Sequence, residues 1–273
     1  WPHDPVVQML EALVSRARIA VYESASRTTS AREFIRRGYW TRVRERSGAL
    51  ALAAVLLFLP LLVASIWGVV DPQAAINLVP GEYRGVVEEQ PGGQDLELSP
   101  QEAAAFSTFI FTNNIQVTFV SFAGGVLAGL GTAWILLYNG TFIGAVAGLS
   151  IGAGNGLSFL ELVVAHGVLE LSCIVVAGGA GLSLGSALIS PGYRRRIDAV
   201  VTEAHHTVAI VVGTAPRLVV AGLVEGFVTP GGYGFVVVLT VGLSLGALYW
   251  ALVWLLGTPD PRAELAASPA GTH

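Results

Sequence analysis

An uncharged run of 24 residues, from Ser47 to Val70, constrains the fold of this chain more than any other feature. About 20 apolar residues are enough for a helix to cross the hydrocarbon of a bilayer. Only helices and closed barrels satisfy every backbone polar group there. Charged residues make up 12% of the 273 residues, about half the share of a soluble domain. We therefore expect an all-α fold, a polytopic transmembrane helical bundle that crosses the cytoplasmic membrane several times.

The later apolar segments are less regular than the first. A second span is expected at 115–138, with a turn at Asn139-Gly140. Residues 141–155 are apolar but too short for a comfortable crossing, so they form either a thin span or half of a re-entrant hairpin. Residues 157–189, 199–224 and 234–256 complete the set. This gives about six apolar segments with both termini cytoplasmic, or four or five if the short segment does not cross.

The charged residues predict the orientation and the flanking regions. Residues 1–46 are rich in Arg and have helical apolar spacing, which predicts a cytoplasmic amphipathic region. It lies either at the lipid headgroups or in an ordinary helical hairpin. The transmembrane bundle is expected at 47–257, followed by a disordered cytoplasmic tail at 258–273.

The segment after the first span is acidic. We expect residues 71–98 to form an extracytoplasmic loop. Ser99-Pro100-Gln101-Glu102 has the pattern of a capping box, so an interfacial helix is expected at 99–113 and is interrupted at Asn113-Asn114.

Several function classes have no support in the sequence. The chain contains no Lys, so a phosphate-binding Gly-Lys-Ser/Thr loop cannot exist. It also contains no Gly-x-Ser-x-Gly and no His-Glu-x-x-His motif. Cys173 is the only cysteine, which excludes an intrachain disulfide. The net charge of −4 argues against a nucleic-acid partner. The sequence therefore leans against an enzyme, and no cofactor is expected.

Ionisable side chains inside the apolar segments are the candidate functional residues, because a charge within a bilayer costs about 3 kcal/mol or more. His166 and Glu170 are four residues apart and share one helical face. Arg217 is expected to pair with a buried carboxylate. Three interpretations stay open: an ion-pair network that fixes helix packing, a proton or ion relay, and a metal site with His166 and Glu170 as ligands. The candidate cluster comprises Glu161, His166, Glu170, Arg217 and Glu225.

Glycine is abundant, with 33 residues in the chain. Gly144, Gly148 and Gly152 are spaced by four, which allows helix backbones to approach closely in lipid. We favour close packing over a glycine-lined pore. The packing could extend across a homodimer or another homo-oligomer.

Several sequence blocks resemble the stage II sporulation protein M family of integral membrane proteins. They include Asn113-Asn114-Ile115-Gln116-Val117-Thr118-Phe119, Tyr138-Asn139-Gly140, Ala165-His166-Gly167-Val168-Leu169-Glu170 and Ala221-Gly222-Leu223-Val224-Glu225-Gly226-Phe227. The resemblance covers roughly residues 30–256 with the blocks in order. Its motif positions include the polar residues Asn113, Asn114, Asn139, His166, Glu170 and Glu225.

The resemblance implies a function but no catalytic residues. The namesake of the family looks like a membrane anchor that holds extracytoplasmic peptidoglycan hydrolases during sporulation. Relatives in organisms that do not sporulate tend to be encoded near a MoxR-type ATPase and an RDD-family membrane protein. The first hypothesis is therefore a scaffold for cell-envelope remodelling that recruits such partners. Transport of an ion or small solute is the second, and an intramembrane metal-dependent hydrolase is the third.

Overall fold

The computed structural model describes residues 31–79, 100–228 and 233–258. Every regular element within these ranges is a helix. The chain divides into two compact units, and the first ends at Gly38. Its described part consists of α2 (Ala31–Glu33) and the π-helix η1 (Phe34–Gly38). The second unit begins at Tyr39 and contains the bundle.

The second unit is built from long helices joined by short ones. Its elements are α3 (Tyr39–Glu45), α4 (Ser47–Val70), α5 (Pro72–Ala75), η2 (Ile76–Leu78), α7 (Pro100–Ala123), η4 (Gly124–Leu127), α8 (Leu130–Gly152), α9 (Gly156–Ile189), α10 (Arg196–Val228) and α11 (Phe235–Leu256). Within the described residues, α4, α8, α9, α10 and α11 are long and apolar enough to cross a membrane. The expected all-α polytopic bundle is confirmed.

The first reversal of the chain lies elsewhere than the sequence suggested. Helix α7 continues through Asn113-Asn114 without a break, so the expected interfacial helix at 99–113 is the first half of a 24-residue helix. The chain then turns through η4, where Ala128 and Gly129 adopt left-handed backbone angles with φ of 54° and 82°. Gly129 takes this conformation without steric penalty, because it has no Cβ. The turn expected at Asn139-Gly140 is absent, since both residues lie within α8.

Close packing explains why Asn139-Gly140 does not form a turn. A Cβ on Gly140 would lie 2.1 Å from the carbonyl oxygen of Leu57, and Asn139 is buried. The pair therefore serves a helix contact. The expectation that residues 141–155 form a thin span or a re-entrant hairpin is also wrong, because no helix begins at residue 141. Most of that segment is the second half of α8, which is 23 residues long.

The contact between α4 and α8 is made by backbone on backbone. A Cβ on Gly140, Gly144 or Gly148 would lie 2.1 Å from the carbonyl oxygen of Leu57, Leu61 or Ser65, respectively. Both series rise by four, so the two helices run in parallel. Small residues at this spacing allow such approach in a membrane, where van der Waals contact rather than the hydrophobic effect holds helices together.

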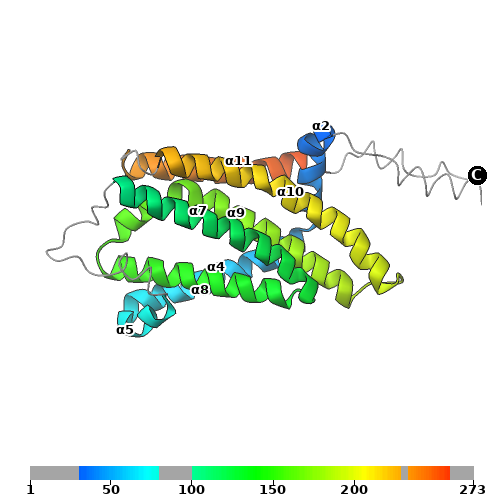
Figure 1. Cartoon of the computed structure of the whole chain (residues 1–273), viewed down its shortest axis with the longest axis horizontal. Coiled ribbons are helices and arrows are strands. Elements are labelled where there is room, and N and C mark those ends of the chain that lie inside the picture. Colours follow the sequence, from blue (N-terminus) through cyan, green and yellow to red (C-terminus); the bar gives the residue numbers. More distant parts are fainter. Residues whose placement is uncertain (1–30, 80–99, 229–232, 259–273) are drawn as a thin grey trace, which may run out of the picture. The chain divides into compact units, whose positions relative to one another are not determined.

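Helix α9 is the central helix and contacts all the other long helices. Helix α7 runs parallel to α9, because Asn114 meets Glu170 and Gly125 meets Gly181. Helix α11 is also parallel to it, since a Cβ on Gly242 would touch Val164 and Trp250 Nε1 donates to Ser172 Oγ. Helices α8 and α10 run the opposite way and follow tight turns (Figure 1). The long helices α4, α7, α8, α9, α10 and α11 therefore alternate in direction along the chain.

The start of α4 and the end of α11 lie at the same end of the bundle. In α3, the Arg44 guanidinium donates to the carbonyl oxygen of Trp254 and, at 3.0 Å, to Thr258 Oγ1. The backbone of Trp40 lies against Gly257. The alternating directions of the long helices from α4 to α11 produce this arrangement.

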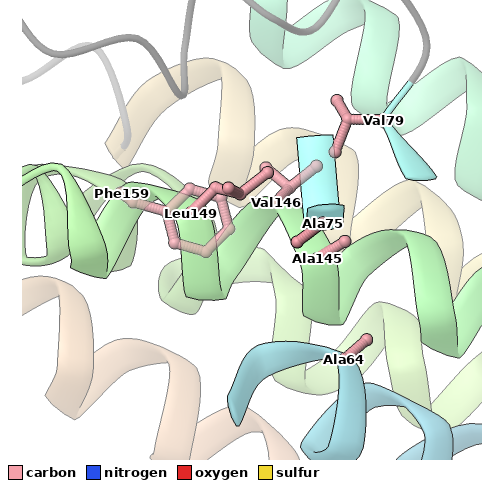
Figure 2. Packing of buried hydrophobic residues seen from close by; sticks show 7 residues of the cluster. All are labelled: Ala64, Ala75, Val79, Ala145, Val146, Leu149 and Phe159. Carbon is pink, nitrogen blue, oxygen red and sulfur yellow. The ribbon is translucent and has the colours of Figure 1, made fainter. Parts of the chain in front are cut away.

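The short helices α5 and η2 cover the C-terminal end of α8. Val79 and Ala75 are fully buried against a cluster that includes Val146, Leu149 and Phe159. Figure 2 shows Val146 and Leu149 of α8 and Phe159 of α9 near Ala75 of the short helix α5. The segment after the first span therefore folds back onto the bundle before the chain reaches α7.

Candidate functional site

A histidine and a carboxylate face each other between α9 and α10. His166 Nε2 lies 3.7 Å from Glu225 Oε1, and the exposed fractions of the two residues are 1% and 2%. Neither ring nitrogen of His166 has a hydrogen-bond partner among the described residues. The sequence suggested Glu170 as the partner of this imidazole, because the two are one helical turn apart. The structure instead brings Glu225 to it from the neighbouring helix.

Glu170 is held by α7 instead. The Asn114 side-chain amide donates a hydrogen bond to Glu170 Oε2, and both residues are buried. Among the described residues, Glu170 Oε1 has no hydrogen-bond partner. The backbone carbonyl oxygen of Asn114 accepts a hydrogen bond from Thr118 Oγ1 at 2.7 Å. We call His166, Glu170, Glu225 and Asn114 the His–Glu cluster, and it joins α7, α9 and α10.

A pocket of about 70 Å³ lies beside this cluster. Its polar side is formed by Asn113, Asn114 and His166. The rest of its lining comes from α8 and α9 and consists of Phe142, Ile143, Val146, Phe159, Val163, Gly167 and Leu171. Several of these residues are half-buried, so the pocket opens at the surface of the bundle.

Arg217 lies outside the His–Glu cluster. Its guanidinium carbon is 4.0 Å from the ring centroid of Tyr39 and 4.6 Å from that of Trp40, and it donates to the carbonyl oxygen of Gly213. Within the described ranges it forms no ion pair with a carboxylate. The expected pairing with a buried Glu is therefore not what the structure has. Aromatic faces stabilise a desolvated guanidinium by cation–π attraction.

Glu161 is also separate from the cluster. It is half-buried near the start of α9 and has no ion pair within residues 31–79, 100–228 and 233–258. In these same ranges, no three His, Cys, Asp or Glu side chains are grouped closely enough to hold one metal ion. The candidate metal ligands His166 and Glu170 are therefore not part of such a group within the described residues.

A second buried polar group was not recognised from the sequence. The Tyr39 hydroxyl hydrogen-bonds Thr214 Oγ1 at 3.1 Å and the Tyr249 hydroxyl at 2.8 Å. These residues tie α3 to α10 and α11. The amphipathic pattern of residues 1–46 places Tyr39 and Trp40 only at the headgroup level. The adjacent aromatic residues Tyr39 and Trp40 also indicate a binding site for a guanidinium group. The sequence does not identify the Arg that occupies it, which in the structure is Arg217.

The fold and the site together define a class of protein: a multi-pass α-helical membrane protein with a buried His, Glu and Asn cluster. Residues 53–230 match the sequence model of stage II sporulation protein M, and the chain belongs to that family.

Other comparisons are more limited. The chain is 32% identical over 76 residues to an uncharacterized protein of Methanocaldococcus jannaschii. The matched segment covers 28% of this chain and 43% of that relative, so it spans less than half of the relative's length. No solved structure matches the chain.

Proposed function

We propose that this protein is an integral membrane scaffold that recruits partner proteins for cell-envelope remodelling. The observation that carries the proposal is the contact between α4 and α8, where glycine backbones touch carbonyl groups along three successive turns. Such a contact leaves no room for a solute between these helices and makes this pair rigid. Rigid helices that hold partners at a fixed spacing are what an anchoring complex requires.

The charge distribution supports an orientation for this scaffold. Arg42, Arg44 and Arg46 precede α4. A second run of three Arg, at 194–196, lies in the turn after α9 and at the first residue of α10. Arg46 Nε donates to Glu203 Oε1 at 2.8 Å, so these two Arg groups lie at one end of the bundle. The positive-inside rule assigns that end to the cytoplasm. The acidic segment at 71–98 would then face the wall and its hydrolases.

Site-specific crosslinking in the native membrane tests the scaffold. A photoreactive amino acid is placed at Asn77, at Tyr193 or at Leu62, all of which are exposed. The expected result is a peptidoglycan hydrolase captured repeatedly from Asn77 and a different partner from Tyr193. Leu62, in the apolar face of α4, serves as the lipid-facing control. Recovery of only lipid and the chain itself from all three positions would refute the scaffold.

Transport is a second candidate, favoured by the His–Glu cluster. Buried carboxylates and an imidazole between three helices are expensive in lipid and often mark the path of a proton or ion. The pocket beside His166 gives this group access to the surface of the bundle.

Reconstitution in liposomes separates transport from the scaffold. A proton or ion flux that depends on the protein, and that is lost when both His166 and Glu225 are replaced, would support transport. Flux that survives the double replacement removes these residues from the pathway. Absence of flux together with specific crosslinks favours the scaffold.

A further inference from the structure

The pocket beside His166 has two chemically different sides. The Nδ1 and Nε2 atoms of His166 have no hydrogen-bond partner within the described part of the chain, although the residue is 99% buried and lines the pocket. An unsatisfied buried polar group costs about 1–3 kcal/mol. Phe142, Ile143 and Val163 form an apolar part of the same lining. A ligand that fits both sides has a hydrogen-bonding group attached to an apolar chain.

The depth of the pocket indicates where such a ligand comes from. Val146 is six residues from the end of α8, and His166 is ten residues from the start of α9. At 1.5 Å per residue these positions are about 9 and 15 Å from the helix ends, within one leaflet of the hydrocarbon. The half-buried residues Asn113, Phe142 and Ile143 form its open side. The helices α7 and α8 meet at η4 and diverge away from it (Figure 1).

The charges around the pocket restrict the head group. Glu225 lies 3.7 Å behind the imidazole, and Glu170 lies behind Asn114. The described lining residues include no Arg, and Arg217 is engaged by Tyr39 and Trp40. Because two carboxyl groups lie behind a lining without basic side chains, a phosphate or carboxylate head group is disfavoured. The amide groups of Asn113 and Asn114 and an imidazole suit a hydroxyl, which both donates and accepts.

The volume limits how much of the ligand enters. A cavity needs about 10–15 Å³ to hold one water, so 70 Å³ holds on the order of five non-hydrogen atoms. That is a head group and the first carbons of one chain. The remaining chain would extend between α7 and α8 into the lipid.

We propose that the pocket formed by α7, α8 and α9 binds an uncharged single-chain lipid with a hydroxyl head group, which enters from the bilayer and hydrogen-bonds His166. The α5–η2 segment packs against the same wall, because Val146 and Phe159 belong both to the pocket and to the cluster that buries Ala75 and Val79 (Figure 2). A lipid bound in the pocket would therefore contact the residues on which α5 and η2 pack.

Photolabelling of the full chain in phosphatidylcholine nanodiscs tests this site. The probe is dodecanol with a diazirine at mid-chain, and labelled peptides are mapped by mass spectrometry. Labels are expected on residues 111–117 and 142–146. Unlabelled dodecanol should compete at a concentration at least about tenfold lower than dodecyl phosphate, because burying an unpaired charge is costly. Equal competition by the two would overturn the assignment of an uncharged head.

Two pairs of variants separate binding in the pocket from general lipid contact. His166→Leu should weaken binding about fivefold, the effect of one hydrogen bond, whereas His205→Leu on the exposed face of α10 should not. Ile143→Trp should block the pocket, and Leu137→Trp, on the exposed face of the same helix, is its control. Ile143→Trp keeps the test valid if His166→Leu does not fold. Labelling that is unchanged by Ile143→Trp, or spread evenly over α4, would overturn the proposal.

Discussion

Glu225 Oε1 lies 3.7 Å from His166 Nε2, and both side chains are buried between α9 and α10. The distance is too long for a hydrogen bond, and the pair is ionic only when the imidazole is protonated. The two residues come from helices that are antiparallel, 59 positions apart in the chain. Their contact is a specific link between α9 and α10.

A double-mutant cycle should detect this link. His166→Leu and Glu225→Gln are each expected to destabilise the protein, and the double variant should be more stable than their sum by about 1 kcal/mol, as for polar pairs in other membrane helices. Reversible unfolding in mixed micelles measures the free energies. A cycle between Glu225 and the exposed His205 is the control and should give no coupling. Additivity within about 0.3 kcal/mol for His166 and Glu225 would contradict the contact.

Cysteine accessibility should report the reversal at η4. In a Cys173→Ala background, Val126→Cys and Tyr193→Cys should react with an impermeant maleimide from one side of the membrane, and Asn77→Cys from the other. Val126 and Tyr193 are exposed and lie at the turns that follow α7 and α9. Asn139→Cys should not react from either side, because it is buried in the middle of α8. Reaction at Asn139→Cys but not at Val126→Cys would restore a turn at Asn139-Gly140.

The bundle itself was predictable because hydrocarbon thickness fixes the length of a span. Ser47–Val70 is a helix at the residues expected for it. The first turn was not predictable, because glycine has two opposite uses. At Gly129 it permits a positive φ, whereas at Gly140 it permits a backbone contact within a helix. Sequence alone shows no difference between them, since the close contact of Gly140 is with Leu57 in another helix.

The candidate site was predictable in part. Intramembrane position identified His166, Glu170 and Glu225 as costly groups, and the structure places them near one another. Their partners could not be derived, because helical spacing describes only neighbours on the same helix. Asn114 is 56 residues from the carboxylate that it contacts. Arg217 was assigned a carboxylate on charge alone, although aromatic rings were an equally good partner.

Gly144→Ala should destabilise the bundle through the α4–α8 contact. Its new Cβ would lie 2.1 Å from the carbonyl oxygen of Leu61, so the helices would have to separate. We expect a loss of about 1–3 kcal/mol, the usual cost of overpacking. Gly226→Ala on α10 is the matched control, because no atom lies within 4 Å of the added Cβ. Thermal unfolding in detergent measures both. Equal melting temperatures for the two variants would show that α4 and α8 are not so closely packed.

Arg217→Lys should be harmful even though it keeps the positive charge. The planar guanidinium lies over Tyr39 and Trp40 at 4.0 and 4.6 Å, and an ammonium group cannot stack on both rings in the same way. The expected loss, measured by reversible unfolding in mixed micelles, is about 1 kcal/mol of unfolding free energy. Arg194→Lys, at an exposed position in the turn before α10, should change nothing. In a Trp40→Leu background the effect of Arg217→Lys should be smaller, because half of the aromatic site is then missing. If Arg217→Lys were neutral and independent of Trp40, charge alone would matter, and pairing with a carboxylate would again explain this residue better than its aromatic contacts.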